Sequence, residues 1–426
     1  MKITFCSYDW PGLVGGPNVW LTRLLPELRR RGIQSRVFFF TYHGSPSTCP
    51  TVLTLRSLGF DCPAINTPVY MEDRVRWILT QVNGDPPDVL VVNHVVPALY
   101  AGRWALEAGI PTVGTMRSDH SEDHAILSEF VLGDPAFHTS AVVCVSEFLE
   151  QEVLKQNPKN VLVRRIPSGV PLPEHVAESP AGQRMRLVYA GRLVEKQKRI
   201  SDLTRALRRA VREVPNTEAF IYGDGPDMPA VKQILSSDGD ALPVYLAGRV
   251  GSDQIQRHLL ASHVLVLLSD YEGLPVSLME GMACGVVPIC LRIRSGIPEL
   301  VEHDKTGLLV NDRGDDFVNA VHRLRFESNL WSRLSVGARA KIETGYSNEE
   351  CVSRWEALFH ELRERSKARR AVQVPGRIVL PPAHPDLAQG DVRKPPVLKL
   401  YTRGTWRLAR KIAHRALNAH RRLSRT

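Results

Sequence analysis

Two carboxylates, Glu272 and Glu280, lie eight residues apart and flank a Gly-Leu-Pro turn. The apolar run 263–268 before them predicts a short buried strand. Pro275 fits the start of a helix because its φ is already helical and it has no N–H to leave unpaired, and Gly285 fits the end of that helix. The turn therefore directs free N–H groups and a positive helix end toward one point, which favours an anion. With a carboxylate on either side, the site suits a nucleotide sugar, whose diphosphate lies between hydroxyl-bearing rings.

A basic segment, Gly-Arg-Leu-Val-Glu-Lys-Gln-Lys-Arg, follows the apolar run 185–190. Arg192 offers a bidentate fork and Lys198 a point charge, and both groups bind phosphate oxygens. Cations fixed at a departing nucleoside diphosphate stabilise the charge that grows on it in the transition state. Lys196 and Arg199 compete with Lys198 for this role, and a basic helix start facing solvent is the purely structural interpretation.

Glycine-rich turns occupy positions where the backbone could approach a ligand. Residues 12–17 lie between the first predicted strand and the first predicted helix, and Gly15 and Gly16 there would admit a phosphate or a sugar close to the main chain. The turn Gly-Asp-Gly-Pro at 223–226 follows another predicted strand, where it is alternatively no more than a turn.

These segments together resemble the large family of retaining glycosyltransferases with the GT-B fold, often called family 4 or group 1. The paired glutamates, the basic segment and the Gly-Asp-Gly-Pro turn carry the resemblance, which covers residues 1–365. It implies that Glu272 holds the transferred sugar, that Glu280 holds the ribose, and that Arg192 and Lys198 hold the diphosphate. The other residues that the resemblance assigns to the donor are Gly15, Gly16, Gly223, Val250, Gly273, Leu274 and Pro275.

The chain departs from the family pattern after the strand that we predict at 112–115. Many relatives have a histidine directly after this strand, whereas here Arg117 takes that position and His120 follows three residues later. Both residues are therefore candidates for contact with the reacting sugar.

Two groups of residues have spacings typical of metal ligands. His120, Asp123 and His124 form one, although we interpret them as a polar loop with incidental histidines. The Asp-Gly-Asp at 238–240 matches the metal motif of a different glycosyltransferase fold, but it lies in a polar stretch that we interpret as a turn. We therefore expect no metal and no cofactor, with the nucleotide sugar as co-substrate.

Strand-like and helix-like segments alternate in two series, which predicts an α/β protein with two doubly wound parallel sheets. We assign an N-terminal, Rossmann-like acceptor-side domain to residues 1–170 and a C-terminal, Rossmann-like nucleotide-sugar-binding domain with five strand-like runs to residues 184–346. A helix over 347–365 closes this unit. Two such domains facing across a cleft are the GT-B architecture that the resemblance implies.

The basic charge of the chain belongs to its C-terminal part. Residues 365–426 contain 16 Lys and Arg and two acidic residues, whereas residues 1–364 contain 39 basic and 43 acidic residues. We interpret 366–426 as a basic tail that contains a Pro-rich linker over 371–398. The pattern over 405–423 predicts a basic amphipathic helix that fits an anionic membrane surface. A solvated or disordered tail is the rival interpretation, and we expect no nucleic acid because no binding motif accompanies the charge.

No apolar run reaches the ~18 residues of a membrane-spanning helix, and the N-terminus lacks the pattern of a signal peptide. The seven cysteines include no CxxC pair. We therefore predict a cytoplasmic protein, peripheral to the inner face of the plasma membrane if the tail binds lipid.

The predicted function is a metal-independent, retaining hexosyltransferase that moves a sugar from a nucleotide sugar, UDP favoured over GDP, to a carbohydrate or lipid-linked acceptor in surface polysaccharide or glycolipid synthesis. The alternatives are a GT-B sugar-nucleotide epimerase or phosphorylase, and a non-catalytic relative that binds nucleotide sugars.

Overall fold

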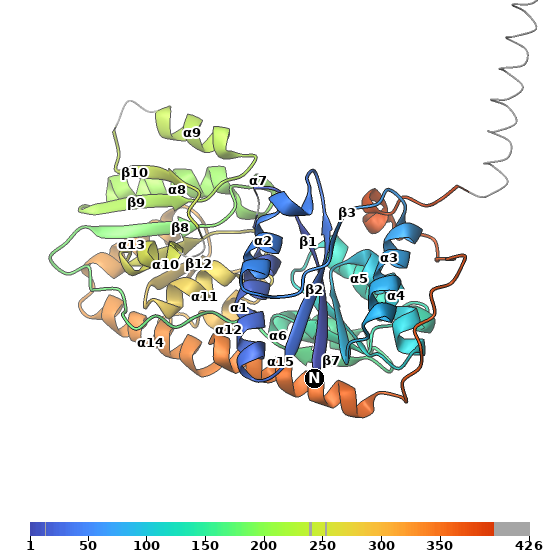
Figure 1. Cartoon of the computed structure of the whole chain (residues 1–426). Helices are drawn as coiled ribbons and strands as arrows, with labels where there is room; N and C mark the ends of the chain where they lie inside the picture. The colour runs from blue at the N-terminus through green and yellow to red at the C-terminus, as the bar shows by residue number, and fades with distance from the viewer. Residues whose placement is uncertain (13, 238–240, 252–253, 396–426) are drawn as a thin grey trace, which may run out of the picture.

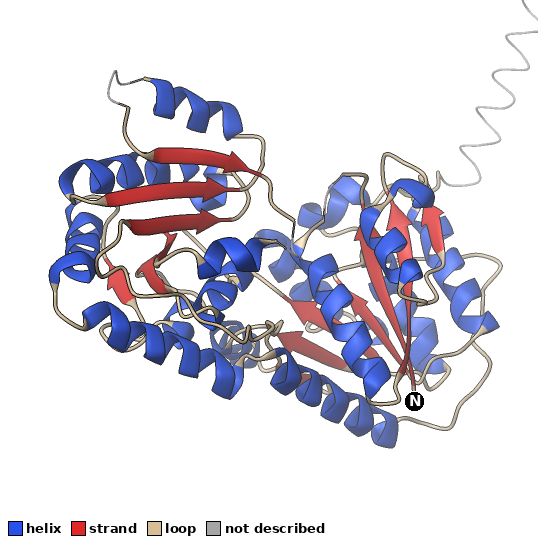
Figure 2. Cartoon of the chain, turned by 60° about the vertical axis from the view of Figure 1, so that its left-hand side comes forward, coloured by secondary structure: helices blue, strands red, loops and turns tan. Residues whose placement is uncertain are grey.

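The computed structural model describes residues 1–12, 14–237, 241–251 and 254–395 of the 426-residue chain. Two parallel sheets, each flanked by helices, lie side by side (Figures 1 and 2). The predicted class, two doubly wound α/β units, is confirmed. The predicted turn at 238–240 and the predicted helix at 405–423 lie outside the described residues.

The first sheet has seven strands in the order β3-β2-β1-β4-β5-β6-β7, all paired in parallel. Its central strands are buried along most of their length, as expected for a sheet covered on both faces, although β1 also buries the polar residues Thr4, Ser7 and Asp9. The strands are β1 (Lys2–Asp9), β2 (Gln34–Thr41), β3 (Ala64–Asn66), β4 (Val89–Asn93), β5 (Thr112–Met116), β6 (Ala141–Cys144) and β7 (Leu162–Arg165). The helices around them are α1 (Gly16–Arg30), η1 (Pro46–Thr48), α2 (Pro50–Ser57), α3 (Met71–Gly84), α4 (Val96–Glu107), α5 (Ser121–Phe130), η2 (Pro135–Phe137) and α6 (Glu147–Lys155).

The second sheet has six strands in the order β10-β9-β8-β11-β12-β13, again parallel. We predicted five of these strands and missed the short edge strand β13. The strands are β8 (Met185–Ala190), β9 (Thr217–Tyr222), β10 (Val244–Gly248), β11 (Val264–Leu267), β12 (Val287–Leu291) and β13 (Leu308–Val310). The helices are α7 (Glu195–Lys198), α8 (Ile200–Glu213), α9 (Met228–Ser236), α10 (Ile255–Leu260), α11 (Val276–Ala283), α12 (Ile297–Leu300), α13 (Asp315–Phe326) and α14 (Leu330–Gly345).

The helix α15 (Asn348–Arg365) leaves the second unit and packs on the core of the first (Figure 1). Its Trp355 and Phe359 are buried against Trp20 of α1 and Phe5 of β1, with ring centroids 5.4 Å apart for the two tryptophans and 6.2 Å apart for the two phenylalanines. The predicted closing helix therefore ties the two units together rather than extending the second.

The linker that we predicted over 371–398 is described as far as residue 395, and the segment 366–395 packs on the first unit instead of running free. It climbs the outer side of the first unit (Figure 1), where Val372, Ile378 and Leu387 are buried in a cluster with residues of α3, α4 and α5. The N–H of Met71 donates to the carbonyl oxygen of Val392 at 2.8 Å, and η3 (Pro385–Gly390) lies within the segment. The apolar residues are too irregularly spaced to predict a helix or a strand, yet each finds a place on an existing surface.

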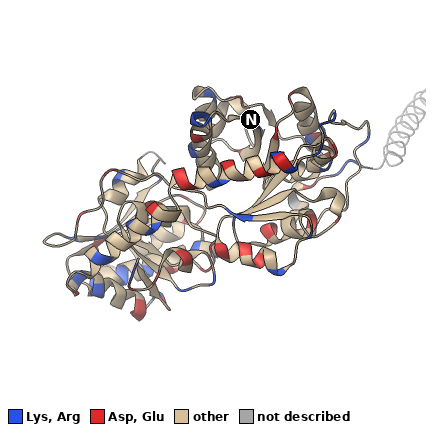
Figure 3. Cartoon of the chain, turned by 90° about the horizontal axis from the view of Figure 1, so that it is seen from below, with Lys and Arg blue, Asp and Glu red and all other residues tan. Residues whose placement is uncertain are grey.

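Acidic and basic residues are interspersed along the helices of both units (Figure 3). Among the described residues, no helix combines the length and the apolar character needed to cross a bilayer. The helices thus expose charged residues and bury apolar ones against the sheets, which is the usual arrangement when helices cover both faces of a sheet.

Candidate active site

Glu272 and Lys198 form a buried ion pair near the carboxyl ends of the neighbouring strands β11 and β8. The chain leaves β11, passes through the turn and enters α11, whose N-cap is Pro275 and whose end is followed by Gly285 at φ +74°. The Lys198 ammonium donates to Glu272, and the side chains are 10 % and 6 % exposed. Gln197 adds a hydrogen bond of 3.2 Å from its side-chain amide to the carbonyl oxygen of Tyr271. The short helix α7 is therefore fixed to the turn that carries Glu272.

The geometry separates the three basic residues that compete on α7. Lys196 is exposed, and Arg199 pairs with Asp202 at 2.7 Å, so only Lys198 faces Glu272. The sequence could not decide this because Lys196 and Lys198 share one short helix and Arg199 follows directly as its C-cap.

Arg192 lies in the loop between β8 and α7, with its side chain exposed and its guanidinium 3.1 Å from the side-chain oxygen of Gln197. Its carbonyl oxygen accepts the Tyr189 hydroxyl at 2.7 Å. Gly223, at φ +151°, supports the same loop, since an added Cβ would lie 1.9 Å from the carbonyl oxygen of Gly191. The Gly-Asp-Gly-Pro turn thus fixes the backbone of the basic segment and leaves the Arg192 guanidinium at the surface.

Glu280 on α11 forms an ion pair with Arg23 on α1 of the first unit, and each side chain is 16 % exposed. Sequence analysis missed Arg23. The sequence showed only that this helix mixes apolar and basic residues. No feature of the neighbouring residues connects Arg23 with a carboxylate 257 residues away. The carboxylate that the resemblance assigns to the ribose therefore has a cationic partner from the opposite unit.

The glycine loop after β1 meets the second unit at Gly12, whose carbonyl oxygen accepts the Arg249 guanidinium. Gly15 and Gly16 begin α1 without a side-chain cap, and a Cβ added at Gly16 would meet no described atom within 4 Å. Val250, the other predicted residue of this region, is partly buried against the second core. Asn18, which sequence analysis missed, donates 2.9 Å to the carbonyl oxygen of Tyr8 and so fixes the first turn of α1.

The turn that carries Glu272 lies directly against the first unit. A Cβ on Gly273 would lie 1.9 Å from the carbonyl oxygen of Arg117, and the N–H of Gly296 donates to the Gly273 carbonyl oxygen at 2.8 Å. Leu274 and Pro275 are buried at the same boundary. A glycine is therefore required here for close approach of two backbones rather than for an unusual φ.

Arg117 follows β5 but turns inward, with its guanidinium 4.6 Å from the ring centre of Trp20. Burial lowers the pKa of Arg117 to about 10, and the nearby Asp123 carboxylate acts in the opposite direction. The side-chain Nε of Arg117 is buried without a partner among the described residues.

Asp123 is the anchor of this loop. It accepts the Arg117 N–H at 2.8 Å and the Ser118 hydroxyl at 2.6 Å, and the His94 Nε2 lies 3.0 Å away. Burial by itself would raise the pKa of Asp123, but His94 and these hydrogen bonds outweigh it and hold the pKa at about 2. His94, which follows β4, was not singled out in the sequence.

His120 is the N-cap of α5 and accepts the N–H of Glu122 at 3.4 Å, while its ring centroid lies 6.2 Å from that of Tyr271 in the second unit. His124 pairs with Asp119 at 2.7 Å. His120, Asp123 and His124 therefore face different partners, and the described part of the chain brings no three His, Cys, Asp or Glu side chains together as a candidate metal centre.

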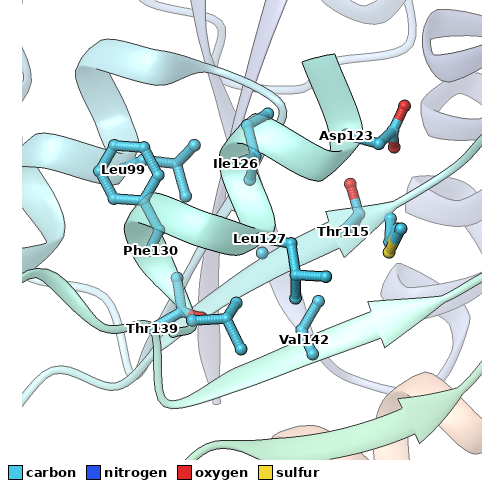
Figure 4. A pocket seen from close by; sticks show the side chains of 11 residues that line it. Leu99, Thr115, Asp123, Ile126, Leu127, Phe130, Thr139 and Val142 are labelled. Atoms are coloured by element: carbon cyan, nitrogen blue, oxygen red, sulfur yellow. The ribbon is translucent and has the colours of Figure 1, made fainter. Parts of the chain in front are cut away.

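A small cavity lies between α5 and the strands β5 and β6 (Figure 4). Its lining is mainly apolar, with Leu99, Leu127 and Phe130 among the side chains, and the Asp123 carboxylate is directed away from Phe130 (Figure 4). The cavity lies within the first unit, and Asp123 is its one charged lining residue, whereas Glu272, Lys198 and Arg192 do not line it.

Comparison with known proteins identifies the family and the fold of the chain. The family model for glycosyl transferases group 1 matches residues 184–325, and that for the glycosyl transferase 4-like domain matches residues 15–169. The lipopolysaccharide 1,6-galactosyltransferase of Escherichia coli is 24% identical over 317 residues, which cover 72% of this chain and 84% of that protein. The N-acetyl-alpha-D-glucosaminyl L-malate synthase of Bacillus anthracis is 30% identical over 169 residues, which cover 39% of this chain and only 43% of that protein.

Among solved structures, Anabaena Alr3699/HepE in complex with UDP and glucose is similar with a TM-score of 0.68 and 17% identity. The similarity covers 85% of this chain and all of that one. At this identity the similarity concerns the fold alone: two Rossmann-like units arranged in the same way in both proteins.

Proposed function

Because the chain belongs to the group 1 glycosyltransferases and has the GT-B fold, we propose that it moves a sugar from a nucleotide-sugar donor to a carbohydrate or lipid-linked acceptor. The observation that carries the proposal is the group formed by Arg192, Lys198 and Glu272 at the carboxyl ends of the second sheet. A glycine loop and a cationic helix of the first unit approach the same region, so both partners of a transfer reaction can be held between two sheets.

In this proposal each charged residue holds one part of the donor. Arg192 and Lys198 bind the diphosphate, Glu280 the ribose hydroxyls and Glu272 the hydroxyls of the transferred sugar. The exposed Arg192 guanidinium can turn toward a phosphate because its partner among the described residues is the neutral side-chain amide of Gln197. Lys198 can contribute to the diphosphate while it remains beside Glu272, since an ammonium has three donors.

The proposed reaction retains the anomeric configuration. The bond between the anomeric carbon and the phosphate oxygen breaks, and the acceptor oxygen bonds to that carbon from the same face. The acceptor proton passes to the departing phosphate, so the nucleoside diphosphate leaves with one added proton. Arg192 and Lys198 stabilise the charge on the leaving group, which is the part of the transition state that gains negative charge. We propose that no metal takes part.

We propose a UDP-sugar as donor and surface polysaccharide or glycolipid synthesis as the setting. The donor proposal is supported by the UDP and glucose bound to the Anabaena protein, and the setting by the role of the Escherichia coli relative in lipopolysaccharide. The basic sequence 405–423 would carry the protein to an anionic membrane surface. Sedimentation with phosphatidylglycerol vesicles tests this, since a chain ending at residue 395 should lose the binding and neutral vesicles should not bind the full chain.

The test of the function is a thermal-shift panel of UDP-, GDP- and ADP-sugars on the full chain, with EDTA in a duplicate set. Ligand that binds only the folded state raises the melting temperature. We expect a shift with UDP-sugars that EDTA does not change. Arg192→Ala should lose the shift, whereas Lys196→Ala, a matched loss of an exposed cation close by, should keep it.

A transfer assay with the donor that gives the shift then tests the chemistry. Proton NMR of the first-formed product should give the same anomeric configuration as the donor, and an inverted product would overturn the proposed mechanism. Absence of a shift with every nucleotide sugar would overturn the proposed function and favour a phosphorylase or a relative that has lost the donor site.

A further inference from the structure

Four aromatic rings gather where β1 and β2 end. Trp10 and Tyr42 are stacked, with their centroids 5.5 Å apart and an angle of 14° between the rings. Tyr8 lies 6.0 Å from Trp10 and 5.5 Å from Tyr42, and His43 follows at 6.4 Å from Tyr42. Tyr42 and Trp10 are half-buried and His43 is exposed, so the outer part of this cluster faces solvent.

The cluster is held in place from below. The buried Asp9 carboxylate accepts the N–H of Trp10 at 3.1 Å and also the N–H groups of Thr51 and Val52 at 2.9 and 3.0 Å, which ties the end of β1 to the start of α2. A Cβ added at Gly44 would lie 2.4 Å from a ring carbon of Pro11. The two loops that carry the rings are therefore packed against each other, and the rings do not have to be ordered when a ligand arrives.

The position of the cluster connects it with the candidate active site. Trp10 is followed by Pro11 and by Gly12, whose carbonyl oxygen accepts Arg249 of the second unit. The rings therefore stand on the first-unit side of the boundary between the units, next to the glycine loop. The charged residues proposed for the donor belong mainly to the second unit, so these rings are available for the other substrate.

We propose that Trp10 and Tyr42 are a stacking platform for a sugar ring of the acceptor. This inference rests on the proposed function and extends it, because it names the chemical class of the acceptor as a glycan or a glycosylated molecule recognised through its sugar. A pyranose ring has a face of C–H groups that packs on the negative face of an aromatic ring, while its hydroxyls point outward to polar groups such as the His43 imidazole. Large half-exposed rings beside a polar side chain suit such an amphipathic ligand.

Saturation-transfer NMR tests the platform with octyl β-glucoside and octyl β-galactoside, each below its micellar concentration and with UDP present. In the wild type we expect the pyranose ring protons of at least one glycoside to receive more saturation than the octyl chain. Trp10→Ala and Tyr42→Ala should each raise the dissociation constant about tenfold, the loss expected for one stacking contact. Trp10→Phe should keep most of the affinity because it keeps a ring.

Two controls separate this inference from folding and from the proposed function. Phe326→Ala removes a ring that is 53% exposed on α13 and should leave glycoside binding unchanged. The thermal shift with UDP-glucose should persist in Trp10→Ala, which shows an intact donor site in a folded variant. Failure of that shift in the wild type would instead contradict the proposed function.

Three results would overturn the platform. The first is that the wild type saturates neither pyranose ring, and the second is that Trp10→Ala and Tyr42→Ala bind the glycosides as tightly as the wild type. The third is that these variants lose saturation of the octyl chain while the pyranose ring protons keep theirs. The last result would assign the rings to a lipid chain rather than to a sugar.

Discussion

Lys198→Met removes the cationic partner of a carboxylate that remains buried. Both side chains of the pair are at most 10 % exposed, and within the described part of the chain the Glu272 carboxylate has one other side-chain hydrogen bond, from the Gln197 amide at 3.5 Å. Removing one member of a buried ion pair typically costs about 3–5 kcal/mol because the other charge is left without compensation. For a unit of this size such a loss lowers the melting temperature by roughly 2–4 °C for each kcal/mol.

The double variant Lys198→Met with Glu272→Gln removes both charges together. A neutral amide at 272 can still accept from Gln197, so we expect the free energy of unfolding to return to within about 1–2 kcal/mol of the wild type. Urea unfolding followed by circular dichroism measures all variants. The matched control is Lys196→Met on the same helix, whose exposed side chain should contribute less than about 0.5 kcal/mol.

The reasoning fails if Lys198→Met is as stable as Lys196→Met, or if the double variant is no more stable than Lys198→Met. Either result would mean that Glu272 is not left with an uncompensated charge. The double variant also separates folding from chemistry, because it should regain stability and remain unable to transfer sugar. Recovery of activity together with stability would contradict the proposed roles of both residues.

Four further changes have expected outcomes. Gly273→Ala should lower the transfer rate about 100-fold without unfolding the chain, because its Cβ would lie 1.9 Å from a carbonyl oxygen of the first unit; steady-state kinetics and circular dichroism check this. Burial raises the pKa of Glu299 from 4.5 to about 7, so the folded state holds the proton more tightly than the unfolded state does. The resulting contribution to stability is fully present below pH 4.5 and is lost as the pH rises through 7. The difference in unfolding free energy between wild type and Glu299→Gln should fall by about 3 kcal/mol over that range, measured in urea. Arg23→Gln should lower the dissociation constant for UDP-glucose about threefold by calorimetry, because it frees Glu280 from a competing cation. Leu387→Asp should destabilise the first unit by about 2–4 kcal/mol in urea, whereas a free linker would tolerate it.

Local chemistry predicted the parts of the site that lie within one stretch of chain. Gly285 ends α11 as expected, because a positive φ is a property of a single residue. Pro275 marks the start of the helix, but as an extended N-cap with ψ 117° rather than within the first turn as we predicted. The strands β8 and β11 were predicted from their apolar runs for the same reason: a strand covered on both faces has little choice of residue type.

The parts that could not be predicted depend on contacts distant in sequence. Arg23 has no local feature that distinguishes it from the other basic residues of α1, and its partner is fixed only when the two units are placed. The choice of Lys198 over Lys196 depends on the rotation of one short helix. The segment 366–395 has little periodicity, so its burial follows from the shape of the surface formed by α3, α4 and α5 rather than from its own pattern.

The two carboxylates proposed for the donor differ in what their partners connect. Lys198 and Glu272 belong to the same unit, so a ligand that shares this pair breaks no ion pair between the units. Arg23 and Glu280 belong to different units, so a ribose that takes Glu280 must exchange an ion pair between the units for its own hydrogen bonds. The close approach of the Gly273 and Arg117 backbones and the hydrogen bond from the Arg249 side chain to Gly12 do not involve either carboxylate and can persist through that exchange. Donor binding is therefore expected to be coupled to the fit between the units through Arg23, and a ligand that lacks the ribose should bind without that coupling.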